Sequence, residues 1–122
     1  MAEINQDSAQ VYYLAINLAA LAVMSSQPNS AIPQLAKDLA RRAVDHCATS
    51  PPSHWSYATE GEAALILGDL DRADMFYRKA ISMTNSPRDL DSMYSQAIRI
   101  AARVLGELGA EHVETLFGVP NP

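Results

Sequence analysis

The sequence contains few of the residues that mark disulfide-bonded or nucleic-acid-binding proteins. Among 122 residues there is one cysteine, Cys47, which excludes a disulfide within the chain and favours a reducing compartment such as the cytoplasm. The nine Lys and Arg residues are scattered and are outnumbered by 14 Asp and Glu residues, which gives a net charge of −5. Because affinity for nucleic acid depends on a concentrated positive surface, we expect no nucleic-acid partner.

Long apolar runs are also missing. The longest, from Val11 to Met24, covers 14 residues and is interrupted by Asn17, whereas a membrane-spanning helix needs about 20. Residues 1–7 contain acidic side chains and no Lys or Arg, unlike the charged start of a signal peptide. We therefore expect no membrane association and a cytoplasmic location.

Motifs for catalysis and metal binding are absent from the sequence. There is no glycine-rich phosphate loop and no serine placed in a strand-to-helix turn, so we predict no catalytic residues, no enzyme activity and no cofactor. His46, Cys47 and His54 are near one another, but their spacing does not match the usual Cys and His pairs of zinc sites. We expect no metal, and we interpret Cys47 as a buried, inert thiol on the apolar face of a helix.

What the chain does have is apolar residues with a helical period along most of its length, without a useful stretch of strand-like alternation. We predict an all-α fold with five helices and a short sixth. The predicted helices cover about residues 7–26, 31–47, 53–67, 70–83, 87–108 and 110–117.

Capping residues and turn residues set these predicted boundaries. Asp7 and Ser86 each precede a residue with capping-box spacing, and we expect them to begin helices. Gly68 and Gly109 are expected to end helices, with Asp69 capping the next one. The run from residue 27 to residue 30 is predicted to be a turn, after which Pro33 would lie in the first turn of the second helix.

Two of the predicted helical hairpins look like divergent copies of one unit. The first-helix positions Tyr13, Ile16, Asn17, Ala19 and Val23 fall 42 positions before Trp55, Ala58, Thr59, Gly61 and Leu65. The second-helix positions Ala36, Ala40 and Ala43 fall 37 positions before Ala73, Tyr77 and Ala80. Small residues at these positions allow close approach of the helix backbones. The chain is therefore predicted to be a single domain of residues 1–122, with repeat hairpins at about 8–47 and 53–84 and closing helices at about 87–108 and 110–117.

These residues resemble a known family. The pattern consists of Tyr12-Tyr13 with Ile16-Asn17, Trp55 with Ala58-Thr59 and Glu62-Ala63, Leu67-Gly68-Asp69, Ala73 with Tyr77 and Ala80, and finally Gln96. It is similar to the tetratricopeptide portion of the TRAFs-binding domain, found in apoptosis signal-regulating kinases and in bacterial relatives, over roughly residues 10–105. The resemblance implies a right-handed α-α superhelix and an adaptor or regulatory scaffold that binds a protein or peptide. Since a kinase domain is missing from this sequence, we carry over the interaction module and not the binding of TRAF adaptors.

The first helices of tetratricopeptide arrays line a concave surface, and a row of residues on those helices is the candidate partner-binding groove. Its members are Tyr13, Asn17, Trp55, Thr59, Glu62 and Gln96. The alternative interpretation is structural: Trp55 would pack between hairpins, and Asn17 and Thr59 would bond to neighbouring backbone. A further alternative is a small-ligand sensor that binds between hairpins near Trp55.

The first predicted helix is apolar on nearly all sides and must be covered on more than one. A homodimer, a different partner or the final helix could cover it, and we favour a homodimer. The residues expected to mediate self-association are Val11, Leu14, Leu18 and Leu21. A structural self-association domain is therefore the alternative to an adaptor.

Overall fold

The computed structural model describes residues 2–26 and 31–118, and within these ranges the side chains from Tyr12 onward. This part of the chain forms α-helices and contains no strand, which confirms the all-α prediction. The helices are α1 (Ala2–Ser25), α2 (Gln34–Ala48), α3 (His54–Leu67), α4 (Leu70–Met83) and α5 (Pro87–Leu116). None of the helices in the described ranges is long and apolar enough to cross a membrane.

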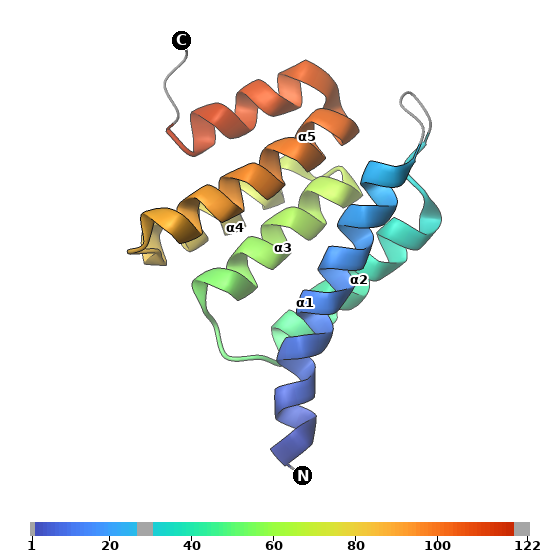
Figure 1. The fold of residues 1–122 in the computed structure, drawn as a ribbon, viewed down its shortest axis with the longest axis vertical. Coiled ribbons are helices and arrows are strands. Elements are labelled where there is room, and N and C mark those ends of the chain that lie inside the picture. The colour runs from blue at the N-terminus through green and yellow to red at the C-terminus, as the bar shows by residue number, and fades with distance from the viewer. Residues whose placement is uncertain (1, 27–30, 119–122) are drawn as a thin grey trace.

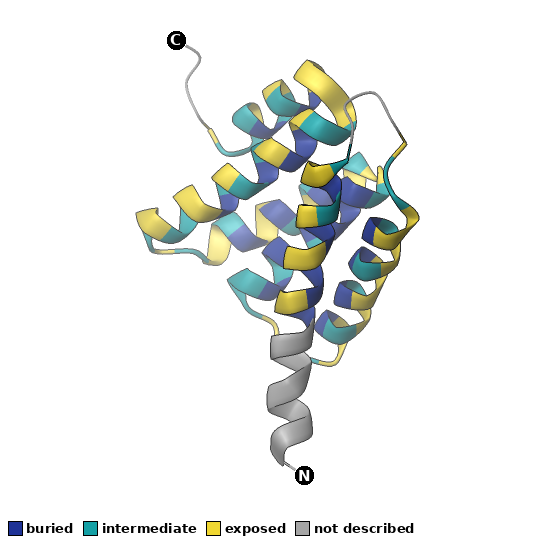
Figure 2. Ribbon diagram, turned by 45° about the vertical axis from the view of Figure 1, so that its right-hand side comes forward, coloured by how far each residue is buried: buried dark blue, intermediate teal, exposed yellow. Residues whose placement is uncertain are grey.

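Consecutive helices pack as antiparallel neighbours (Figure 1). Helix α1 packs mainly against α2, and α3 packs mainly against α4; α2 also lies against α3. Helix α5 packs on α3 and makes smaller contacts with α1 and α4. The buried residues of each helix face this shared interior, whereas the exposed ones form the outer surface (Figure 2).

Small side chains fill the positions where helices cross, as the repeat pattern predicts. Six such alanines are at most 1% exposed, namely Ala19, Ala36, Ala40, Ala43, Ala73 and Ala80. Gly61 is also buried, and a Cβ atom at this position would lie only 2.8 Å from the ring of Tyr77. The mid-helix glycine therefore serves the close packing of α3 on α4, where a larger side chain would collide with an aromatic ring.

The predicted hinge between α3 and α4 is confirmed in detail. Gly68 ends α3 with a left-handed backbone conformation, φ 81°, which glycine adopts without steric cost. The Asp69 carboxylate accepts a hydrogen bond from the backbone N–H of Arg72 at 3.1 Å, so Asp69 caps α4. Ser53 caps α3 and Ser86 caps α5, each by accepting a backbone N–H with its hydroxyl oxygen.

Two predicted helix starts are wrong. Helix α1 begins at Ala2 rather than near Asp7, because the residues before Asp7 include good helix formers and no residue that stops a helix. Pro33 precedes α2 instead of lying in its first turn: its ψ of 141° is extended, and its carbonyl oxygen accepts the first amide bonds of the helix. The turn predicted at residues 27–30 lies outside the described residues.

The final boundary also differs from the prediction. The helical conformation breaks at Gly106, with φ 73° and ψ −158°, and not at Gly109. Beyond this kink the chain turns back on itself (Figure 1). Gly109 lies buried in the returning segment, where an added Cβ would be 2.6 Å from the carbonyl oxygen of Ala101. Gly106 therefore forms the turn, and Gly109 allows the returning segment to approach the backbone of Ala101 closely. The two helical segments are 87–105 and 107–116 rather than 87–108 and 110–117.

A candidate groove between helices α1, α3 and α5

All six predicted partner-binding residues line one cavity of about 240 Å³ between α1, α3 and α5. Its lining consists of Tyr13, Ile16, Asn17, Trp55, Ala58, Thr59, Glu62, Ser92 and Gln96. The repeat pattern had placed Tyr13 and Asn17 in register with Trp55 and Thr59, and the structure brings both pairs to the same cavity.

A second cavity, of about 430 Å³, continues from the first. It also has Asn17 and Gln96 in its lining, together with Ala20, Leu21, Met24, Arg99 and Ile100. Because the two cavities share Asn17 and Gln96, they form a single groove, which we call the α1–α3–α5 groove. Its Trp55 end is polar and aromatic, and its Met24 end is mainly apolar with one arginine.

Helical spacing explains how the sequence builds this groove. On α1 the lining residues Tyr13, Asn17 and Met24 are separated by four and seven positions and so share one face. The same holds for Trp55, Thr59 and Glu62 on α3 and for Ser92, Gln96 and Arg99 on α5. Three consecutive odd-numbered helices thus present one face each to the same surface.

Glu62 is the ionisable group at the centre of the Trp55 end. Its side chain is buried, with 8% exposed, and its Oε1 atom has no hydrogen-bond partner among the described residues. Burial raises the pKa of Glu62 to about 8, although a hydrogen bond with the Gln96 side chain favours the charged form and opposes this shift. Tyr77 lies nearby on α4, and burial together with the Glu62 charge raises the pKa of its phenol well above the usual value.

Trp55 lies between the hydrophobic core and the cavity. The side chain is half-buried and packs against the hydrophobic core, and it also lines the cavity. The His54 ring lies beside it, with centroids 4.8 Å apart. Asn17 is exposed at the cavity, whereas Thr59 is buried with 6% of its surface exposed.

The predicted self-association residues lie on α1 beside the groove, and one of them, Leu21, also lines its Met24 end. Leu14, Leu18 and Leu21 are 59%, 43% and 62% exposed, and the Val11 side chain lies outside the described residues. We call these three leucines the α1 leucine face. The alternative in which the final helix covers α1 does not hold for these leucines, which are exposed; the segment after Gly106 contacts α4 through His112 and Asp74.

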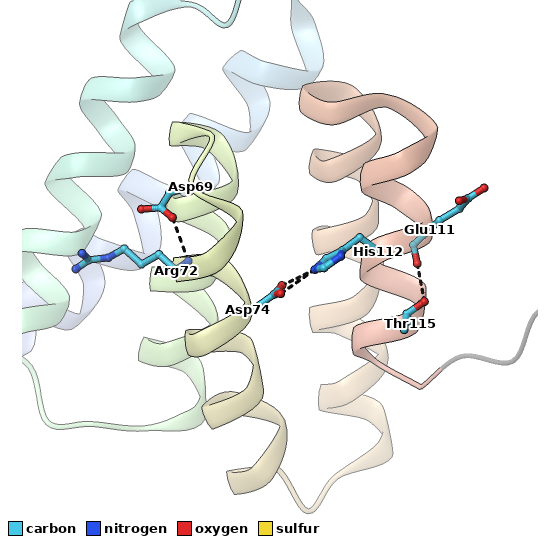
Figure 3. Close-up of polar contacts among 6 residues, drawn as sticks. All are labelled: Asp69, Arg72, Asp74, Glu111, His112 and Thr115. Atoms are coloured by element: carbon cyan, nitrogen blue, oxygen red, sulfur yellow. Dashed lines mark hydrogen bonds and ion pairs between the residues drawn. The ribbon is translucent and has the colours of Figure 1, made fainter.

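A contact that the sequence did not reveal holds that segment in place. His112 Nε2 lies 2.7 and 2.9 Å from the two carboxylate oxygens of Asp74 on α4 (Figure 3). No spacing in the sequence indicates this pair, because the two residues are 38 positions apart and come together only through the kink at Gly106. Phe117 adds edge-to-face ring contacts to Tyr77 and Tyr94.

Cys47 is buried, with 5% exposed, as its helical position predicted. Burial, assisted by the negative charge of Glu60, raises the pKa of the Cys47 thiol to about 12. The group is therefore a neutral thiol at physiological pH and a poor nucleophile. Among the described residues, no cluster of three or more His, Cys, Asp or Glu side chains is placed to hold a metal ion.

The described residues thus define an all-α domain with one composite groove and one exposed leucine face. Comparisons with protein-family models, with curated proteins and with solved structures find no match to this chain.

Proposed function

We propose that this domain is a protein-interaction module, an adaptor or regulatory scaffold that binds a segment of a partner protein in the α1–α3–α5 groove. The observation that carries the proposal is the convergence of the six candidate residues on one cavity. The repeat and the family resemblance predict these residues from the sequence alone, and the packing of α1, α3 and α5 brings them together.

The arrangement of the helices supports a tetratricopeptide-like stack. The pairs α1–α2 and α3–α4 pack as successive hairpins, and the kink at Gly106 makes α5 a third, shorter hairpin. In such stacks the first helix of each hairpin faces the concave side, and α1, α3 and the first segment of α5 are those helices here. Stacks of this kind present extended surfaces that suit protein partners.

The groove has the chemistry that an extended peptide needs. The amide side chains of Asn17 and Gln96 lie at the centre of the groove, where each can donate and accept hydrogen bonds with a peptide backbone. Leu21, Met24 and Ile100 provide an apolar surface at one end. A peptide could therefore bury an apolar side chain there and its backbone between the amides.

A peptide-display selection tests the proposal. Peptides enriched on the wild-type domain should bind Asn17→Lys at least tenfold more weakly in fluorescence anisotropy, because the new side chain occupies the shared centre of the groove. Ser82→Lys adds the same charge at an exposed position on α4, outside the groove, and should leave the affinity unchanged. Failure to enrich any peptide, or equal binding to both variants, would overturn the proposal.

The α1 leucine face favours a second candidate function, structural self-association. Three exposed leucines on one helix form the kind of apolar surface that usually marks an interface. In a longer stack a preceding hairpin would cover this side of α1, and a second copy of the chain could do the same. The two surfaces share Leu21, whereas Asn17 belongs to the groove alone and Leu14 and Leu18 belong to the leucine face alone, so substitutions at these positions test peptide binding and self-association separately.

A further inference from the structure

The Trp55 end of the groove contains an unmatched buried acceptor. Glu62 is buried, and its Oε1 atom lacks a hydrogen-bond partner among the described residues. Leaving a buried polar group without a hydrogen-bond partner is destabilising, and more so when the group is charged. An incoming donor that reached this oxygen would remove that cost, so the site favours a donor-bearing ligand.

The polar groups that line the cavity with Glu62, or interact with it from α4, carry no positive charge. Helix α1 contributes Tyr13 and Asn17, and α5 contributes Ser92 and Gln96. Helix α4 contributes Tyr77, whose pKa is raised well above its usual value by burial and by the Glu62 charge. No Lys or Arg is present among the described residues that line this cavity, so an external cation would meet no competitor there.

The walls suit an organic cation better than a hydrated ion. Trp55 and Tyr13 supply aromatic surface, which attracts ammonium and guanidinium groups and packs against their aliphatic stems. The cavity volume of about 240 Å³ is roughly eight times the ~30 Å³ that one water occupies in the liquid. A single basic side chain fits this space, with its charged end toward the carboxyl group.

We propose that this cavity receives a basic side chain, Lys or Arg, from the bound partner segment, with its cationic head paired to Glu62. The identity of the ligand as a protein segment rests on the proposed function. The remaining groove then holds the neighbouring residues of that segment, between Asn17 and Gln96 and over the apolar Met24 end.

This pairing makes binding depend on pH in a defined direction. Burial raises the pKa of Glu62 to about 8, and the cation pairs with the ionised carboxylate. About one tenth of the domain is in this form at pH 7 and about nine tenths at pH 9, so the apparent affinity should rise about tenfold between them. The ligand stays charged over this range, since lysine titrates near 10.4 and arginine higher still.

Capped amino acids test the pocket without any peptide. Nα-acetyl-lysine methylamide and the arginine analogue should change the fluorescence of Trp55, the only tryptophan in the chain, with dissociation constants on the order of millimolar. The norleucine analogue, which lacks the charge, should bind at least tenfold more weakly. Lysine binding should tighten about tenfold from pH 7 to pH 9.

Two variants on the same helix make the test specific. Glu62→Gln should reduce lysine binding to the norleucine level and abolish its pH dependence. Glu60→Gln makes the same side-chain replacement on α3, but the Glu60 side chain lines a separate cavity between α2, α3 and α4, so binding should be unchanged. Circular dichroism checks the folding of both.

A measurement on the wild type requires no variant. The carboxyl carbon-13 resonance of Glu62 should titrate at lower pH when the lysine probe is present.

The outcomes separate this inference from the proposed function. Equal binding of the lysine and norleucine probes, or equal effects of the two glutamate variants, overturns the inference. Groove-dependent peptides that tolerate replacement of every Lys and Arg by norleucine would also overturn it, while the proposed function would stand. If the capped lysine binds but no peptide does, the cavity is a site for a free amine. The inference that the basic group belongs to a partner protein would then be wrong, and so would the proposed function.

Discussion

The protonation of Glu62 should also control the stability of the unliganded domain. Burial raises the pKa of Glu62 to about 8, whereas glutamate in an unfolded chain titrates near 4.3. Between these values the folded state binds more protons than the unfolded state, so the free energy of unfolding falls as the pH rises. The slope for this one group approaches about 1.4 kcal/mol per pH unit. Its contribution is complete below about pH 4 and is lost by about pH 8.

Urea denaturation of Glu62→Gln at pH 5, 6.5 and 8 measures this effect. The glutamine cannot ionise, so the variant should gain stability relative to the wild type as the pH rises, by about 1–3 kcal/mol between pH 5 and pH 8. Glu60→Gln is the matched control: burial also raises the pKa of Glu60, but Arg72 and Lys79 oppose the shift. Its gain should be smaller. Wild-type and Glu62→Gln stabilities that change in parallel with pH would show that Glu62 is not buried in this way.

For individual residues, the sequence predicts which side chains line the groove better than it predicts whether Glu62 is protonated. Tyr13, Asn17, Trp55 and Thr59 could be placed together because the 42-residue offset and the helical period fix the face of each helix. The charge state of Glu62 depends on its burial between helices and on its partner Gln96, which comes from α5. Such contacts between helices cannot be read from the spacing within one helix.

Among the helices, α5 departs most from its prediction, and its two glycines should have separable effects. Gly106 has φ 73° and ψ −158°, a conformation that is costly for any residue with a Cβ. Gly106→Ala should destabilise the domain by about 1–3 kcal/mol. Gly109→Ala should cost about 1–3 kcal/mol for a different reason, because its Cβ would collide with the backbone of Ala101.

Thermal unfolding and amide hydrogen exchange of residues 107–116 can check this prediction. Both variants should unfold at lower temperature and exchange faster in that segment, because the contact between His112 and Asp74 depends on it. Gly118→Ala is the control: Gly118 has the same φ of 73° with open space around it, but it follows the last helix. If Gly118→Ala destabilises the domain as much as Gly106→Ala does, the kink is not the source of the lost stability.

The helix boundaries show which features of a sequence determine structure locally. Gly68 and Asp69 form a turn that depends only on adjacent residues, and both were predicted correctly. Gly106 and Gly109 are each compatible with a helix end, and the sequence alone favoured the wrong one. The choice is made by tertiary packing, because only Gly109 lies where the returning segment touches Ala101.

For the whole molecule, the groove and the α1 leucine face give the domain two surfaces with different chemistry. The groove is formed by α1, α3 and α5 together, so it exists only when the hairpins are stacked. The leucine face belongs to α1 alone and does not require the other helices. Leu21 belongs to both surfaces, but the Trp55 end of the groove shares no residue with the leucine face. A partner segment could therefore reach the Trp55 end in a monomer or a dimer, and the state of assembly determines how many such sites each particle presents.

The α1 leucine face predicts a homodimer that Leu18→Glu/Leu21→Glu should convert to a folded monomer, since two charges cannot be buried in an apolar interface without partners. Light scattering over a concentration series gives the mass of each form, and circular dichroism confirms folding. The matched control is Met83→Glu/Leu108→Glu, which changes two exposed apolar residues on α4 and α5 and should leave the dimer intact. Dissociation by both pairs would locate the interface elsewhere. A monomeric wild type would contradict self-association, and α1 would then be a surface for a different protein or remain exposed beside the groove.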